Sequence, residues 1–96
     1  MQFFYKKRYL KRFDRFPRHE QLVILEADRQ IQSYYRTRLA PFGLRIKQLY
    51  TRAEEKILEA RVSNSIRIVW AERVDAVSFV LVGTHDDVKR YLRSLR

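Results

Sequence analysis

The sequence predicts an α+β fold in which a helical hairpin packs on a mainly antiparallel sheet of three to four strands, followed by a C-terminal helix. Apolar residues recur every three to four positions in the first third of the chain and again at its end, as on one face of a helix. From residue 56 the apolar period changes to two, as on one face of a strand. At 96 residues the chain is long enough for one modest core, so a single domain is expected over residues 1–96.

The first half of the chain predicts the helices. Residues 2–5 are a short aromatic run that suits an edge strand, and residues 6–16 carry apolar side chains at helical spacing. A second helix is expected over residues 17–36, because a proline is accepted in the first turn and restricts the residue before it. Residues 37–55 are interrupted by Pro41, a glycine and a charged run, and they predict a loop with a brief strand as the alternative.

Alternation over residues 56–71 predicts a β-hairpin around the turn-favouring triplet at 63–65. The length of the turn sets the register. A three-residue loop pairs Val62 with Ile66 and continues to match apolar with apolar along both strands. A two-residue loop would instead set Arg67 against Val62, so the three-residue loop is favoured.

This register places Arg61 opposite Arg67, on the face turned away from the helices. Like charges opposed across two strands destabilise a sheet, whereas an anion between them would reverse the sign. The fixed fork of donors on arginine suits a phosphate, so we expect an anion site here. Glu59 lies on the same face, where it either neutralises Arg61 or serves as a base. Two solvated arginines that point apart are the alternative.

The nearly continuous apolar run at residues 77–82 predicts a central strand covered on much of both faces. His85 then opens a final helix, with the acidic pair that follows it favouring the helix N-terminus. This position allows His85 to reach a site built on the strand faces, and an exposed histidine without a role is the alternative. Lys89, four residues later, shares its side of the helix. The apolar stripe of the same helix consists of Val88, Tyr91, Leu92 and Leu95.

Charge is the most informative bulk property. The chain has 21 Lys and Arg against 11 Asp and Glu, a net charge of +10, which favours polyanionic partners. Nucleic acid is the leading partner, an acidic protein is compatible, and an anionic membrane is not favoured because the aromatic residues are needed for a core. With no cysteine and two histidines, we expect neither a disulfide nor a metal site nor a cofactor. No apolar run reaches about 20 residues, so a cytoplasmic location is expected.

The segment EARVSNSIRIVWAERVDAVSFVLVGTHDD resembles the C-terminal half of the RelE/ParE superfamily of toxin–antitoxin toxins. The shared pattern is an arginine-bearing strand, a turn, a second arginine-bearing strand, an apolar strand, and a glycine followed by a histidine or arginine. The resemblance implies a RelE-like fold, also described as microbial RNase-like, with the element order β-α-α-β-β-β-α. It also implies a cognate antitoxin that is acidic or wraps the toxin with its tail.

The RelE branch implies a ribosome-dependent, metal-independent mRNA endonuclease that inhibits translation. ParE relatives imply a DNA gyrase inhibitor instead, and a non-catalytic RNA-binding module is the third alternative. Arg61 and Arg67 match the family's basic strand positions that contact the scissile phosphate, and His85 matches the position after the last strand. Relatives with the HDD motif continue with a tyrosine where this chain has Lys89. Lys89 is therefore expected in the active site and Tyr91 in the core, with Tyr91 as the alternative to Lys89.

The reaction implied by the resemblance is attack of a 2′-hydroxyl on the adjacent phosphate, which leaves a 2′,3′-cyclic phosphate and a 5′-hydroxyl. Arg61 and Arg67 would stabilise the developing charge and His85 would protonate the leaving oxygen. The base stays open among Glu59, Lys56 and Lys89. The expected nucleic-acid partners are mRNA and ribosomal RNA, bound in a salt-dependent manner. The basic residues expected to contact RNA are Lys11, Arg12, Arg45, Lys47, Arg52 and Lys56.

Overall fold

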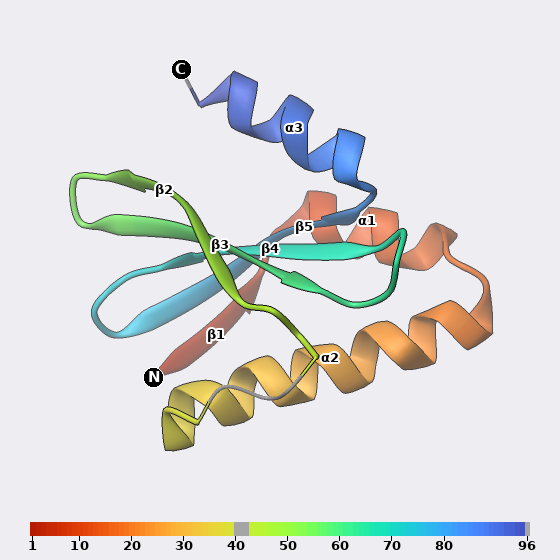
Figure 1. The fold of residues 1–96 in the computed structure, drawn as a ribbon, viewed down its shortest axis with the longest axis horizontal. Coiled ribbons are helices and arrows are strands. Elements are labelled where there is room, and N and C mark those ends of the chain that lie inside the picture. Colours follow the sequence, from red (N-terminus) through yellow and green to blue (C-terminus); the bar gives the residue numbers. More distant parts are fainter. Residues whose placement is uncertain (40–42, 96) are drawn as a thin grey trace.

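The computed structural model describes residues 1–39 and 43–95, so Pro41 in the expected loop lies outside the described residues. These described residues form three helices and one five-stranded sheet, which confirms the predicted α+β class (Figure 1). Among the described residues the sheet has five strands rather than three to four, because residues 47–52, in the segment expected as a loop, form a strand. Four strands therefore follow the helical hairpin, where the implied order β-α-α-β-β-β-α has three. In chain order the elements are β1 (Gln2–Tyr5), α1 (Lys7–Arg15), α2 (Arg18–Thr37), β2 (Lys47–Arg52), β3 (Glu55–Arg61), β4 (Arg67–Glu72), β5 (Ala76–Gly83) and α3 (His85–Ser94).

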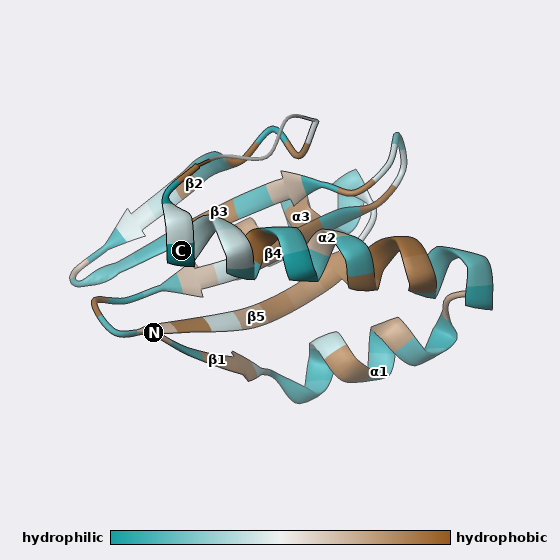
Figure 2. Cartoon of the chain, turned by 90° about the horizontal axis from the view of Figure 1, so that it is seen from below, coloured by the Kyte–Doolittle hydropathy of each residue, from teal (hydrophilic) through white to brown (hydrophobic). Residues whose placement is uncertain are grey.

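The strands lie in the order β1-β5-β4-β3-β2, with β1 parallel to β5 and the other neighbours antiparallel. β5 is apolar along nearly its whole length (Figure 2). Phe79 and Val82 of β5 belong to the core on one side of the sheet, whereas Leu81 belongs to the core on the other side. The prediction of a strand covered on both faces is therefore confirmed.

The pairing of β3 with β4 follows the predicted register. Ala60 pairs with Ile68 and Arg61 with Arg67. The turn is closed by a hydrogen bond from the Val62 amide to the Ile66 carbonyl, with an N···O distance of 2.9 Å. A three-residue turn thus aligns the apolar faces, as the matching of side chains required.

The helical hairpin α1–α2 covers one face of the sheet, where it forms the larger core around Trp70. Trp70 is fully buried, and its indole nitrogen donates to the Tyr35 hydroxyl at 2.6 Å; that hydroxyl donates in turn to Glu72 at 2.6 Å. Burial, together with the Glu72 hydrogen bond, raises the pKa of Tyr35. These hydrogen bonds connect Tyr35 of α2 to the sheet and satisfy the buried indole N–H of Trp70.

The opposite face is covered by α3, whose apolar side packs on Ile57, Val69 and Leu81 (Figure 1). Arg61 and Arg67 belong to this face by the alternation of side chains. The expectation that they lie on a face turned away from the helices is therefore wrong in part: the face is turned away from the hairpin, but α3 packs on it. Among the described residues, no helix is both long and apolar enough to cross a membrane.

Candidate nucleic-acid interface

Three neighbouring strands bring the predicted site residues to one end of the sheet. Arg61 on β3 pairs with Arg67 on β4, and Arg67 pairs with Gly83 on β5. Two residues after Gly83, His85 begins α3 with an exposed side chain. The β3–β4 turn and the start of α3 lie at the same end of the molecule (Figure 1). The backbone thus sets Arg61 opposite Arg67, as the predicted register requires, and begins α3 at His85 near the same end of the sheet.

The side chains do not form a ready anion site. The guanidinium of Arg67 folds back over its own turn and donates to the carbonyls of Ser63, Asn64 and Ile66, at 2.8, 3.3 and 3.2 Å. Arg61 is half-buried beside it. The two arginines are opposed in register, but Arg67 is engaged with neutral carbonyls and not with an anion shared with Arg61.

The candidate bases lie in different surroundings. Glu59 is on the same face of β3 as Arg61 and is 9% exposed. Lys56 points to the other face by alternation and lies near the far end of β3, where it pairs with Glu72. Lys89 is exposed on α3. Of these three groups, Glu59 is the one that shares a strand face with Arg61.

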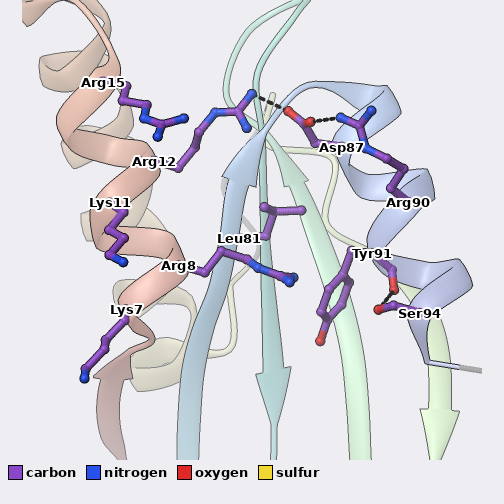
Figure 3. A pocket seen from close by; sticks show the side chains of 10 residues that line it. All are labelled: Lys7, Arg8, Lys11, Arg12, Arg15, Leu81, Asp87, Arg90, Tyr91 and Ser94. Carbon is purple, nitrogen blue, oxygen red and sulfur yellow. Dashed lines mark hydrogen bonds and ion pairs between the residues drawn. The ribbon is translucent and has the colours of Figure 1, made fainter.

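A basic groove of about 590 Å³ lies between α1 and α3 (Figure 3). Its floor is Leu81 of β5, and its walls are the two helices. Six of the described residues that line it are cationic and one is acidic. The lining residues are Lys7, Arg8, Lys11, Arg12, Arg15, Leu81, Asp87, Arg90, Tyr91 and Ser94.

Asp87 holds the groove together. Its carboxylate accepts a hydrogen bond from Arg12 at 2.6 Å and another from Arg90, and it also accepts from the Thr84 amide at 2.8 Å. The Thr84 hydroxyl accepts from the Asp87 amide, which completes a capping box at the start of α3. Burial opposes ionisation, but the Thr84 hydrogen bonds and the two arginines hold the pKa of Asp87 below its ordinary value. One carboxylate thus caps α3 and connects it to α1.

Tyr91 lines the groove and also packs on the core under α3. The Arg8 guanidinium lies 5.7 Å from the centre of its ring. Burial, with the nearby charge of Glu55, raises the pKa of Tyr91. The expectation that Tyr91 belongs to the core is correct for part of the side chain. The structure places Tyr91 in the groove and Lys89 outside it.

The six residues expected to contact RNA fall into two groups. Lys11 and Arg12 lie in the α1–α3 groove. The others lie on or beside the opposite edge of the sheet, where Arg52 is 3.5 Å from the Glu55 carboxylate. This second group consists of Arg45, Lys47, Arg52 and Lys56, all exposed. Among the described residues, no three histidines, aspartates or glutamates gather to hold a metal ion.

Sequence reasoning missed the groove as a unit. The sequence indicates Asp87 only as one of an acidic pair that favours the start of a helix, and it does not distinguish Arg8 and Arg90 from the other basic residues. A signal was present, because α1 has cationic residues four apart on two adjacent rows. The approach of α1 to α3 depends on the parallel pairing of β1 with β5, which a four-residue aromatic run does not reveal.

Neither a family model nor a curated protein matches the sequence. Solved structures do share the fold. The archaeal RelE–RelB complex from Pyrococcus horikoshii OT3 has a TM-score of 0.68 at 10% identity, over 86% of this chain and 92% of that chain. The RelB–RelE complex from Methanococcus jannaschii gives 0.64 at 18% identity, over 92% and 96%.

The YoeB/ParE toxin from Agrobacterium tumefaciens gives a TM-score of 0.63 at 15% identity, over 88% of this chain and 99% of that chain. These similarities extend over nearly the whole of both partners in each comparison. The chain therefore has the fold of the RelE and YoeB/ParE toxins.

Proposed function

We propose that this chain is the toxin of a toxin–antitoxin module and that it cleaves RNA at the end of the sheet where β3, β4 and β5 meet. The observation that carries the proposal is the alignment of Arg61, Arg67 and the strand end before His85 on three neighbouring strands. Two guanidinium groups and one imidazole suit a phosphate and its leaving group. The fold, which RelE toxins share, supports the same assignment.

In the proposed reaction the 2′-oxygen of a ribose attacks the adjacent phosphorus and the bond to the 5′-oxygen breaks. The products are a 2′,3′-cyclic phosphate and a 5′-hydroxyl. Glu59 takes the proton of the 2′-hydroxyl, because it lies on the face of β3 that carries Arg61, roughly 7 Å along the strand. Lys89 is the alternative base. His85, exposed at the start of α3, gives its proton to the leaving oxygen.

Arg61 and Arg67 stabilise the negative charge that develops on the phosphate. Arg67 must first leave the three turn carbonyls that it contacts. A charge-assisted hydrogen bond to phosphate is about twice as strong as one between neutral groups, so a bound phosphate favours the exchange. Substrate binding thereby completes the site.

The proposed partners are mRNA within the ribosome and a cognate antitoxin. The net charge of +10 favours both ribosomal RNA and an acidic protein segment. Two of the structures that share the fold are complexes of RelE with RelB, which supports an antitoxin partner for this chain. A role in RNA binding without cleavage is the second candidate, because Arg67 contacts its own turn.

The test combines growth arrest with primer extension on a translated mRNA, with and without ribosomes. His85→Ala and Arg67→Ala are each expected to lower cleavage by about 100-fold or more. Matched controls are His19→Ala and Arg36→Ala, which remove the same groups from exposed positions on α2 and leave cleavage unchanged. Full toxicity and cleavage in both site variants would refute the assignment. Intact mRNA with DNA damage signalling would indicate gyrase inhibition, and RNA binding without cuts would indicate a non-catalytic module.

A further inference from the structure

The cations of the α1–α3 groove form two rows along α1. Arg8 and Arg12 form an inner row that points across the groove toward α3 (Figure 3). Lys7, Lys11 and Arg15 form the outer row, of which Lys7 points away from α3. Within each row, residues four apart lie roughly 6 Å apart along the helix axis. This separation is comparable to the distance between successive phosphates of a single RNA strand.

One carboxylate partly neutralises this surface. Asp87 contacts Arg12 and Arg90, but Arg8 and the outer row have no carboxylate among the described residues that line the groove. Asp87 is 8% exposed and is fixed to the helix start by Thr84, so it cannot swing away from α3. The Arg12 side chain is 35% exposed and has solvent on one side. Arg12 is therefore open to a second anion, which would compete with Asp87 for it.

We propose that the α1–α3 groove binds the phosphate backbone of single-stranded RNA and that Asp87 competes with the phosphates for Arg12 and Arg90. The inference rests on the proposed function for the choice of RNA as the polyanion. The groove adjoins the end of the sheet that carries Arg61 and Arg67, but neither of these arginines lines it. Asp87 thus limits the affinity of the toxin for RNA while it holds α3 in place.

RNA is favoured over an acidic peptide for two reasons. The cations of each row repeat at roughly 6 Å, which is comparable to the separation of successive phosphates, whereas successive residues of an extended peptide lie roughly 3.5 Å apart. The α3 wall adds the Tyr91 ring and the floor adds the Leu81 side chain. Cations beside an aromatic surface are the arrangement with which proteins bind single strands. A peptide of acidic residues offers charge but no matching planar bases.

The first experiment measures binding of a fluorescent 12-nucleotide 2′-O-methyl RNA, which lacks the attacking hydroxyl and stays intact. Asp87→Asn is compared with Asp86→Asn, because Asp86 is exposed on the same turn and its neutralisation changes the net charge equally. Asp87→Asn is expected to bind at least about fivefold more tightly than Asp86→Asn, since it alone releases two arginines. Equal affinities of the two folded variants would overturn the competition.

The second experiment does not depend on the stability of α3. Lys11→Gln with Arg15→Gln removes two exposed cations of the outer row, and Arg18→Gln with Arg36→Gln removes two exposed cations from α2. The slope of log affinity against log salt is expected to fall by about 1.4 in the groove variant, which corresponds to two lost phosphate contacts, and to stay unchanged in the α2 variant. Equal changes in both double variants would overturn the groove as the RNA site.

A 12-residue glutamate peptide tests whether the groove binds an acidic protein segment instead of RNA. If a peptide of the same total charge displaces the RNA, and its affinity rises as much as that of the RNA in Asp87→Asn, the groove binds an acidic protein and the inference is overturned. Cleavage is tested separately from binding. If Asp87→Asn raises the affinity for 2′-O-methyl RNA equally in the wild type and in the Arg67→Ala protein, the groove is supported as an RNA site even where no RNA is cut. Cleavage in a protein whose groove variants show no change in RNA affinity or salt dependence would retain the proposed function and refute RNA binding in the groove.

Discussion

The two basic regions of the molecule differ in what holds their arginines. In the α1–α3 groove, Arg12 is bound by the buried carboxylate of Asp87, an anion fixed to the start of α3. At the end of the sheet, Arg67 is bound by neutral carbonyls of its own turn, directly opposite a second arginine. The charge of Arg12 is thus neutralised by a carboxylate, whereas the charge of Arg67 is met only by neutral groups.

This difference teaches which region exchanges its partners readily and which exchanges them only in competition with a fixed anion. An ion pair with a buried carboxylate is costly to break, because a buried charge would be left alone, so phosphate must compete with Asp87 for Arg12. Hydrogen bonds to turn carbonyls are readily replaced by bonds to phosphate. The regions meet at Gly83, which pairs with Arg67 and lies against Asp87. Gly83 is therefore the position at which one change affects both.

The largest effect is expected from Gly83→Ala. A Cβ atom there would lie 2.5 Å from Oδ2 of Asp87 and 3.0 Å from its Cβ, so the carboxylate that caps α3 must shift. The free energy of unfolding, measured by urea denaturation, should fall by about 1–3 kcal/mol. In an Asp87→Ala background the same change should cost much less, because the clashing group is gone. Additive costs in the double variant would contradict this account.

Much of the fold could be predicted because local patterns determine it. Apolar periodicity indicated all three helices, and the matching of apolar faces fixed the pairing of Arg61 with Arg67. The strand β2 was harder to predict, because it is an exposed edge strand with a bulge between Gln48 and Tyr50. Such a strand lacks the alternation of apolar and polar residues by which strands are predicted from a sequence.

The candidate site was predictable to the level of the backbone and not beyond. Register gives which residues are opposed, but it does not reveal that Arg67 turns back to Ser63 and its neighbours. The groove was even harder to predict from the sequence, because Arg12 and Asp87 are 75 residues apart in the chain. Their contact follows from how α1 and α3 meet at β5, which depends on tertiary packing.

An intermediate effect is expected from pH, through Asp87. Its pKa in the folded protein lies below the ordinary value of 3.8, so its ionised form stabilises the fold above that pH. This stabilisation is lost as the pH falls through the lowered pKa. The melting temperature of the wild type should therefore fall more between about pH 5 and about pH 2 than that of Asp87→Asn. The Asp86→Asn protein is the control and should follow the wild type, whereas parallel curves for all three proteins would contradict the role of Asp87.

The smallest effect, and the most direct test of the contrast, is expected from truncating the two opposed arginines. Arg67→Ala removes three hydrogen bonds to the turn but also relieves the repulsion from Arg61, so its net cost should stay below about 1 kcal/mol. Arg61→Ala relieves the same repulsion and should stabilise the protein by a few tenths of a kcal/mol. Both values follow from urea denaturation, with Arg36→Ala as an exposed control. A cost for Arg67→Ala as large as that of Gly83→Ala would mean that Arg67 is a structural residue, and its proposed transfer from the turn to a phosphate would then be excluded.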